Sequence, residues 1–312
     1  MATSVLITGG AGYIGSVLCN RLLAHGYEVT VLDNLMYRQN SLLHLSYYKN
    51  FNFIKGDARN RELMKGALRG KDFIIPLAAI VGAPACDKNP ALASETNLGA
   101  IRTIVELKEE HQKIVFPNTN SGYGTKDGKQ FCTEESPLQP ISLYGRLKVE
   151  AEGVLLSTPN SIILRLATVF GVSPRMRLDL LVNDFTYRAV RDGYLVLFEK
   201  DFKRNYIHIQ DIAKCFEFCM TNFEKMRGQV YNVGRDDANC SKEELALKIK
   251  NHVPSLKVIS SEIGKDPDKR NYIVSNEKIS KAGFKCDYSL DDGIVELIKG
   301  FRILYDTQYS NL

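Results

Sequence analysis

Residues 4–16, "SVLITGGAGYIGS", decide the fold. A short apolar run, 4–8, leads directly into Gly9, Gly12 and Gly15, which open a helical pattern. The tight turn needs glycine, and a bare backbone at a helix N-terminus lets a pyrophosphate approach free N–H groups and the positive end of the helix dipole. A tight turn without a ligand is the alternative. The glycines stand in the first strand–helix unit, which favours dinucleotide binding.

Two aspartates at expected strand ends fit the same reading. Asp33 ends the apolar run "EVTVLD" (28–33), where its carboxylate can accept hydrogen bonds from the adenosine ribose hydroxyls and would repel a 2′-phosphate. No arginine lies next to it before Arg38, so the sequence favours NAD over NADP. Asp57, in "GDAR" at the end of the third run, could meet the adenine amino group or could be a solvated turn residue.

Apolar runs of strand length alternate with helical patterns through the first 170 residues. The runs are short, apolar on both faces and rich in Val and Ile, which is typical of buried parallel strands. This alternation predicts an α/β fold, a Rossmann-type doubly wound parallel sheet with right-handed crossovers. The expected strands are 4–8, 28–33, 51–55, 72–78, 113–117 and 161–167, and the expected helices are 12–25, 60–69, 90–110 and a helix beginning near 142.

The pattern loosens after residue 170, where longer loops and separate helices appear. We expect residues 1–170 to form the NAD-binding Rossmann domain, with 205–234 returning to it. Within that returning segment "QVYNVG" (229–234) is a candidate further strand. Residues 171–204 and 235–312 are expected to form a smaller nucleotide-sugar-binding lobe over the carboxyl edge of the sheet.

Composition excludes several classes of function. The chain has 312 residues and a net charge of +5 spread along it, without a Lys/Arg block or a basic stripe interleaved with aromatics, so no nucleic-acid partner is expected. A mild positive excess suits a substrate that carries phosphates. The longest apolar stretch, 73–86, is too short to span a bilayer and is broken by prolines. We expect a cytoplasmic protein with no membrane partner.

The seven cysteines are odd in number and form no CxxC pair. This pattern argues against a disulfide framework and against a zinc site, and it favours a reducing compartment. No metal is expected.

The segment "SLYGRLK" (142–148) carries candidate chemistry. Tyr144 and Lys148 lie four residues apart and share one face of the expected helix, which Ser142 can cap. An ammonium beside a phenol favours the phenolate. A phenolate poised near neutral pH can take a proton from a sugar hydroxyl while a hydride leaves the same carbon.

Motifs in order along nearly the whole chain carry a family resemblance. "TGGAGYIG", "DNL", "PLAA", "YGRLK", "LRLATVFG", "RNYIHIQD" and "YNVG" resemble the extended short-chain dehydrogenase/reductases of the nucleotide-sugar epimerase/dehydratase family. The resemblance implies that Thr119, four residues before Tyr123, hydrogen-bonds the reacting hydroxyl and that Tyr144 is the base. It also implies that Lys148 tunes Tyr144 and holds the nicotinamide ribose.

The same resemblance implies further binding residues. Asn183, Arg204 and Arg270 would clamp the substrate diphosphate, because the planar fork of arginine meets phosphate oxygens in pairs. A surface salt bridge is the alternative for each arginine. The implied cofactor-binding residues are Gly9, Gly12, Tyr13, Ile14, Gly15, Asp33, Asn34, Asp57, Ala58, Leu77, Ala78, Ala79, Asn97, Tyr144 and Lys148. The implied substrate-binding residues are Val81, Thr119, Ser121, Arg175, Asn183, Arg204 and Arg270.

Residues 115–124, "VFPNTNSGYG", discriminate among the reactions of the family. The 4,6-dehydratases follow the catalytic Thr with an Asp-Glu pair, whereas Asn120 and Ser121 stand here and cannot act as acid and base. Reductases that epimerise at C3 and C5 carry a Cys near this point, where this chain has Ser121. Hydride abstraction at C4 of the sugar is then the expected chemistry. The chain departs from the family pattern at Pro76, Asn118 and Thr168.

A narrower resemblance names a substrate. "PNTNSGYG" together with "SPRMRLDLLVNDF" (173–185) is most similar to bacterial capsule GDP-heptose 4-dehydrogenases, which implies release of a 4-keto sugar. Two alternatives stay open: an NAD-dependent 4-epimerase, which returns the hydride to the other face, and a dinucleotide-sensing protein without chemistry. The family resemblance also implies a homodimer formed through helices near 90–110 and 142–157.

Overall fold

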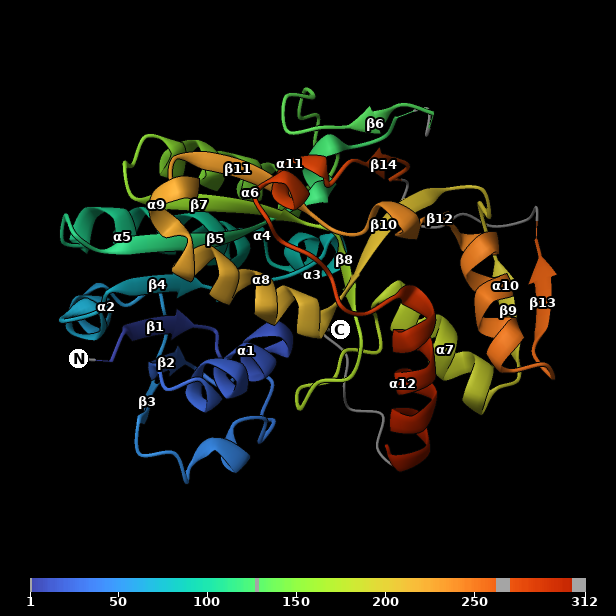
Figure 1. Ribbon diagram of the computed structural model, residues 1–312, viewed down its shortest axis with the longest axis horizontal. Helices are drawn as coiled ribbons and strands as arrows, with labels where there is room; N and C mark the ends of the chain where they lie inside the picture. Colours follow the sequence, from blue (N-terminus) through green and yellow to red (C-terminus); the bar gives the residue numbers. More distant parts are fainter. Residues whose placement is uncertain (1, 127–128, 262–269, 305–312) are drawn as a thin grey trace.

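The computed structural model describes residues 2–126, 129–261 and 270–304. A parallel sheet of seven strands in the order β11-β7-β5-β4-β1-β2-β3 forms its larger part (Figure 1). Because the strand order reverses between β1 and β4, a crevice opens outside their carboxyl ends. The strands are β1 (Ser4–Thr8), β2 (Glu28–Asp33), β3 (Phe51–Lys55), β4 (Phe73–Pro76), β5 (Lys113–Thr119), β7 (Ser161–Leu166) and β11 (Gln229–Val233).

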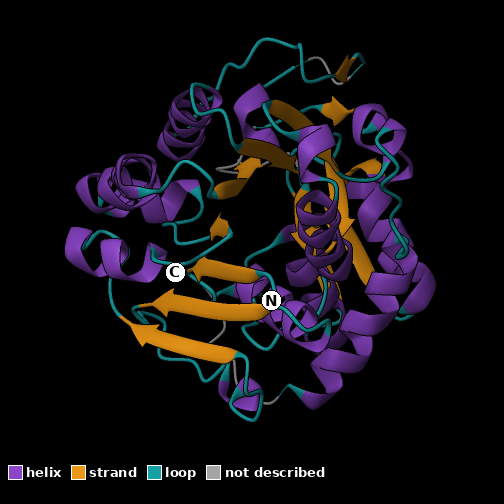
Figure 2. Cartoon of the chain, turned by 60° about the vertical axis from the view of Figure 1, so that its left-hand side comes forward, coloured by secondary structure: helices purple, strands orange, loops and turns teal. Residues whose placement is uncertain are grey.

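Both faces of the inner strands β1, β4 and β7 are buried, which explains why they read as apolar runs, whereas the edge strand β3 is partly exposed. Val5 and Ile7 point to the core shared with α1 (Tyr13–Ala24) and α8 (Ile209–Thr221). Leu6, between them, points to the opposite core. That second core includes residues of α2 (Arg61–Leu68), α5 (Ala100–Leu107) and α6 (Leu143–Leu156). Figure 2 shows the twist that accumulates across the sheet. The predicted α/β fold with a doubly wound sheet is confirmed.

The expected helix over 90–110 is interrupted. It consists of α4 (Pro90–Ser94), a π-helical turn at Glu95–Gly99 and α5, which ends at Leu107. The π turn carries Asn97, whose side chain accepts from the Ile80 amide at 2.8 Å and donates to the Ile80 carbonyl at 2.9 Å. Periodicity could not reveal this turn, because one extra residue in a helix leaves the apolar pattern on either side intact.

Two strand ends also differ from the expectation. β4 ends at Pro76, two residues before the expected 78, and β5 continues to Thr119, two residues beyond 117. The extension of β5 is paired in register with β7, Asn118 opposite Arg165 and Thr119 opposite Leu166. A short 3₁₀ helix, η3 (Asn120–Tyr123), begins directly after it. The polar cluster seen in the sequence therefore stands partly on the strand and partly on a tight turn.

A smaller lobe lies to the right of the sheet in Figure 1 and contains α7 (Leu181–Arg191), α10 (Lys242–His252) and α12 (Leu290–Ile303). β8 (Thr168–Phe170), β10 (Lys203–His208) and β12 (Asn239–Ser241) form a three-stranded sheet, and β9 (Tyr194–Leu197) pairs with β13 (Lys257–Ser260). β6 (Phe131–Cys132) pairs with β14 (Ile273–Val274). The remaining short helices are α3 (Ala83–Lys88), α9 (Phe223–Met226) and α11 (Glu277–Lys281).

The two expected domains include 127–128, 262–269 and 305–312, which lie outside the described residues. In the parts of the chain that are described, no helix combines the length and the apolar character needed to cross a membrane.

Candidate active site

A cavity of about 910 Å³ lies at the carboxyl ends of β1, β4 and β5. It extends from the glycine turn after β1 to the first turn of α6. All the predicted site residues line it except Asn97 and Asn183. The tertiary structure thus brings together the expected cofactor and catalytic residues from segments far apart in the sequence.

The glycine turn packs against the segment that follows β4. Gly9 has φ +71°, and a Cβ there would lie 2.5 Å from the amide nitrogen of Ala78. A Cβ on Gly15 would lie 2.6 Å from the Cα of Gly10. Only glycine allows these approaches, and they leave the N-terminus of α1 open to the cavity. The backbone therefore fits a pyrophosphate, as the sequence predicts.

Asp33 is held as an acceptor beside this turn. Its Oδ2 accepts from the Ala11 amide at 2.9 Å and its Oδ1 from the Leu35 amide at 2.8 Å. Burial raises the pKa of Asp33, and these two hydrogen bonds act against the rise. The bonds fix the carboxyl group at the cavity wall with lone pairs to spare, a geometry that suits ribose hydroxyls.

Asp57 lies farther along the same wall. Its carboxylate forms an ion pair with Arg59 at 2.9 Å, and Arg59 also contacts Glu95 at 2.7 Å. The Arg59 hydrogen bond lowers the pKa of Asp57. Contact between Asp57 and the adenine amino group stays a prediction.

Arg175, which the sequence assigns to the substrate, lines the cavity and contacts the loop after β2. Its guanidinium stacks over the ring of Tyr37 at 4.2 Å, and only 1% of the residue is exposed. Burial lowers the pKa of Arg175, while the charge of Asp33 opposes the shift. The segment between β8 and α7 carries Arg175 across to the loop after β2, a contact that local sequence patterns do not encode.

Asn183, which the sequence assigns to the substrate diphosphate, does not line the cavity. Its Oδ1 accepts from the Gly171 amide at 3.1 Å, and its Nδ2 donates to the Tyr13 hydroxyl at 3.1 Å and to the Arg177 carbonyl at 2.8 Å. Because both N–H groups are used, Asn183 supports the cavity wall instead. Asn97, likewise outside the cavity, holds the Ile80 backbone from behind.

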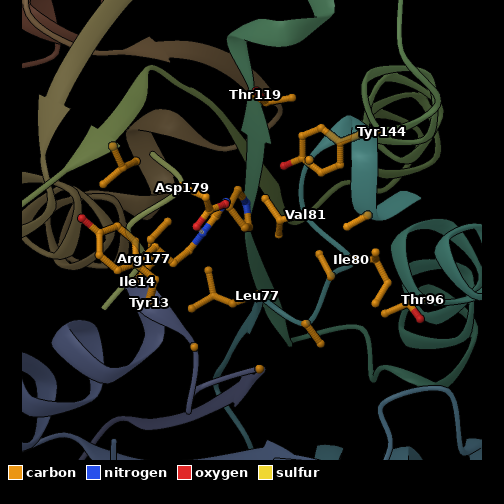
Figure 3. A pocket seen from close by; sticks show the side chains of 18 of the residues that line it. Tyr13, Ile14, Leu77, Ile80, Val81, Thr96, Thr119, Tyr144, Arg177 and Asp179 are labelled. Atoms are coloured by element: carbon orange, nitrogen blue, oxygen red, sulfur yellow. Dashed lines mark hydrogen bonds and ion pairs between the residues drawn. The ribbon is translucent and has the colours of Figure 1, made fainter. Parts of the chain in front are cut away.

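The predicted catalytic residues meet at the other end. Figure 3 shows the Tyr144 hydroxyl pointing into the cavity between Thr119 and the pair formed by Arg177 and Asp179. The Thr119 hydroxyl donates to Ser121 Oγ at 2.9 Å and accepts from the Ser121 amide at 3.1 Å. Ser121 Oγ is also contacted by the guanidinium of Arg270. Hydroxyl, phenol and guanidinium groups therefore converge on one space.

Burial dominates the protonation of the two expected partners on α6. It raises the pKa of Tyr144 to about 12, against the opposing charges of Arg177 and Arg270. It lowers the pKa of Lys148 to about 7, with the ammonium 4.2 Å from the centre of the Phe116 ring. Tyr144 therefore keeps its proton at neutral pH unless further positive charge enters the site. The expected tuning of Tyr144 by Lys148 stays a prediction.

Arg177 and Asp179 form a pair inside the cavity that the site prediction did not include. Arg177 Nε lies 3.1 Å from Asp179 Oδ1, and Nη2 lies 2.5 Å from Oδ2. Burial raises the pKa of Asp179, but the hydrogen bond and charge of Arg177 outweigh it and leave the pKa below its usual range. The signal was present in "PRMRLD", where a carboxylate follows two arginines.

Arg204 and Arg270 line the same end, and the Arg204 guanidinium lies 5.5 Å from the centre of the Tyr272 ring. Tyr272 could have been noticed beside the predicted Arg270, whereas nothing in the sequence around Tyr37 pointed to its role. Within the described residues, no group of three or more His, Cys, Asp or Glu side chains is placed to hold a metal ion.

Comparisons with known proteins agree with this geometry. A Bacillus subtilis protein named as an uncharacterized UDP-glucose epimerase is 32% identical over 228 residues, which are 67% of this chain and 70% of that protein. A UDP-glucose 4-epimerase of Thermus thermophilus, solved with NAD, is 25% identical with a TM-score of 0.82 and covers 96% of this chain and 99% of its own. A UDP-glucuronic acid 4-epimerase of Bacillus cereus, solved with UDP-glucuronic acid and NAD, is 25% identical with a TM-score of 0.84. The match with the Bacillus cereus protein covers 97% of this chain and 100% of that protein.

The model of one family matches residues 5–234, a span that includes the glycine turn, Asp33 and all three predicted catalytic residues. Its description as NAD dependent supports NAD as the cofactor. This chain belongs to the NAD dependent epimerase/dehydratase family.

Proposed function

We propose that this chain uses NAD to oxidise C4 of a nucleoside-diphosphate sugar. The best candidate substrate is a GDP-linked heptose, and the product is a 4-keto sugar for capsule or surface polysaccharide. One observation carries the proposal: Thr119, Tyr144 and Lys148 line the same cavity as the glycine turn. A phenol, a hydroxyl and an amine beside a dinucleotide site are the groups that alcohol oxidation requires.

The proton and the hydride leave the substrate in different directions. The positive charge of a bound nicotinamide would favour the phenolate of Tyr144. That phenolate takes the proton of the C4 hydroxyl, and Thr119 hydrogen-bonds the same oxygen as the C4–O bond becomes a carbonyl. When bound, NAD supplies the acceptor for the hydride from C4. Lys148, one turn after Tyr144 on α6, holds the nicotinamide ribose. The buried setting strengthens each of these hydrogen bonds, because little water competes for them.

Dehydration is a poorer fit than oxidation. Asn120 and Ser121 stand where the dehydratases of the family have an acid and a base, and neither side chain titrates near neutral pH. Asp179 is a carboxyl group inside the cavity, but its pairing with Arg177 keeps it ionised and so unable to protonate a leaving hydroxyl.

Guanidinium groups at the catalytic end supply the diphosphate site. Arg177, Arg204 and Arg270 all line the cavity there, and arginine meets phosphate oxygens in pairs. Asn183, expected as a further diphosphate contact, is bonded to backbone and to Tyr13. The heptose assignment rests on the resemblance of segments 117–124 and 173–185, and both contribute residues to the cavity wall.

A 4-epimerase of a UDP- or GDP-sugar is the second candidate. The relatives described above that are named as epimerases favour it. The same residues serve both reactions, which differ in whether the keto sugar leaves or turns over and takes the hydride back on its other face.

A panel of GDP- and UDP-linked hexoses and heptoses, incubated with the purified protein and NAD, tests the proposal. NADH absorbance reports net oxidation, and NMR with mass spectrometry identifies the product. NADH formation with a 4-keto heptose is the expected result. A C4 isomer without net NADH would replace the dehydrogenase with the epimerase. If the protein binds NAD but converts none of the sugars, a dinucleotide-sensing protein would be favoured.

A homodimer through α4, α5 and α6 is a further part of the proposal. It rests on the family resemblance, which implies contact through the helices near 90–110 and 142–157. Light scattering at several protein concentrations should give twice the chain mass. A single-chain mass throughout would overturn it.

A further inference from the structure

Behind the catalytic threonine, three buried polar side chains from three elements meet. Asn118 on β5 and Arg165 on β7 face each other in register. Glu152 on α6 contacts both: its Oε2 accepts from the Asn118 amide and from Arg165 Nε at 3.1 Å, and its Oε1 accepts from Arg165 Nη2 at 2.6 Å. One carboxylate thus ties two neighbouring strands to the helix above them.

The cluster is closed to solvent and fully bonded. Asn118 and Glu152 are each 4% exposed and Arg165 is 5% exposed. The remaining Arg165 nitrogen, Nη1, donates to the Tyr123 hydroxyl and to the Glu134 carbonyl, each at 3.0 Å. A buried ion pair tolerates little displacement when its other hydrogen bonds are also satisfied, because each lost bond exposes an unpaired charge. The cluster therefore holds β5, β7 and α6 in fixed positions relative to one another.

Both parts of the predicted catalytic site are connected to this cluster, Thr119 through Asn118 and Tyr144 through the helix that carries Glu152. The Asn118 side-chain oxygen accepts the Thr119 amide at 2.8 Å. On α6, Tyr144, Lys148 and Glu152 follow one another at intervals of four, so they lie along one side of the helix. The bond from Asn118 to Glu152 consequently sets the backbone of Thr119 relative to the helix that carries Tyr144.

We infer that Asn118 is a positioning residue. By bonding to Glu152, Asn118 holds Thr119 within reach of the substrate hydroxyl that Tyr144 deprotonates. The inference rests on the proposed function for its kinetic consequence. It accounts for the departure from the family pattern at Asn118. The Asn118 side chain donates to Glu152 and accepts from the Thr119 amide at the same time. A serine side chain is too short to make both hydrogen bonds.

The sharpest test is Asn118→Asp, which keeps the shape and removes the donor. Two carboxyl groups then face each other and keep their hydrogen bond only when they share a proton. The charged and titratable groups of the cluster are Glu152 from α6, Arg165 from β7 and, bonded to Arg165, Tyr123 from η3. Lys148 lies one turn before Glu152 on α6. At about pH 8 we expect kcat of the variant to be roughly 10- to 100-fold below that of wild type at the same pH. This ratio should approach one as the pH is lowered toward about 6.

Further variants separate positioning from folding. Asn118→Ser should lose kcat by a similar factor at every pH, with NAD affinity unchanged. Glu152→Gln should lose kcat, whereas Glu150→Gln, an exposed neighbour on the same helix, should not. Wild-type kcat at pH 8 in Asn118→Asp, or a loss that pH does not reverse, would overturn the inference.

A readout without turnover keeps the inference separate from the proposed function. Hydrogen exchange of a peptide that covers residues 118–123 should be faster in Asn118→Ser than in wild type, since the Thr119 amide loses its acceptor. Unchanged exchange would overturn the positioning role even if no sugar is turned over. If the wild-type protein converts no sugar of the panel while hydrogen exchange is faster in Asn118→Ser, the proposed function is wrong. The hydrogen bond between Asn118 and the Thr119 amide is nevertheless supported in that case.

Discussion

The guanidinium of Arg175 lies 4.2 Å from the centre of the Tyr37 ring and near the carboxylate of Asp33. This contact joins the segment after β8 to the loop after β2, across the cofactor end of the cavity. Arg175 thus adds a buried positive charge to the cavity wall on the side of Asp33.

Replacing Arg175 by glutamine should weaken NAD binding without unfolding the protein. Loss of the stacked cation and of its attraction for phosphate should reduce NAD affinity by roughly tenfold. Calorimetric titration of protein stripped of nucleotide measures the change. Arg61→Gln is the control, because Arg61 forms an exposed pair with Glu106 away from the cavity. Equal NAD affinity in the two variants would assign Arg175 to the substrate after all.

Tyr144→Phe should keep NAD binding and lose turnover. The phenol oxygen is the proposed proton acceptor, so kcat should fall by at least about 100-fold, while the ring still fills its place on α6. Tyr231→Phe, a buried tyrosine on β11 outside the cavity, should keep wild-type kcat. Full activity in Tyr144→Phe would refute the catalytic assignment.

Gly9→Ala and Gly12→Ala should fail in different ways. An alanine at position 9 needs φ +71° and meets the Ala78 backbone, so we expect a loss of about 2–4 kcal/mol in the free energy of unfolding. At position 12 the backbone is extended, and a Cβ would meet only the Gly9 carbonyl at 3.1 Å. Stability should then change by less than about 1 kcal/mol.

The methyl group of the alanine in Gly12→Ala should nevertheless lie where the pyrophosphate approaches the helix. NAD affinity should therefore fall by roughly tenfold or more. Urea unfolding and NAD titration of both variants measure the two effects. Wild-type NAD affinity in Gly12→Ala would place the pyrophosphate elsewhere.

Lys148 should make the stability of the nucleotide-free protein depend on pH. Its pKa is about 7 in the folded chain and 10.5 for an ordinary lysine, so between these values the unfolded chain binds the extra proton. Stability should therefore rise with pH across this window, and the full cost of burying the charge should be present below about pH 7.

Lys148→Met removes this group and should be more stable than wild type by roughly 3–5 kcal/mol near pH 6, with the difference shrinking toward pH 10. Urea unfolding of both proteins across this range gives the difference directly. A constant difference at all pH values would show that Lys148 does not titrate with folding.

Local patterns in the sequence determined the frame of this protein. The runs at 4–8, 28–33 and 51–55 are the strands β1, β2 and β3 with the same ends. β1 is buried along its whole length, whereas β3 lies at the edge of the sheet, where Asn52 and Lys55 are exposed. The glycine turn and the Tyr144–Lys148 spacing were equally visible, since each is fixed within one turn or one helix. These elements led to the family.

Only the tertiary structure decided what each polar side chain does. Arg175 stacks on Tyr37, the Asn183 amide donates to backbone and to Tyr13, and Asn118 bonds to a carboxylate on α6. Each of these contacts joins segments far apart in the chain, and its energy depends on burial that no local window contains. The same burial moves the pKa of Tyr144 up and that of Lys148 down, because a charge loses its hydration only when the fold closes around it.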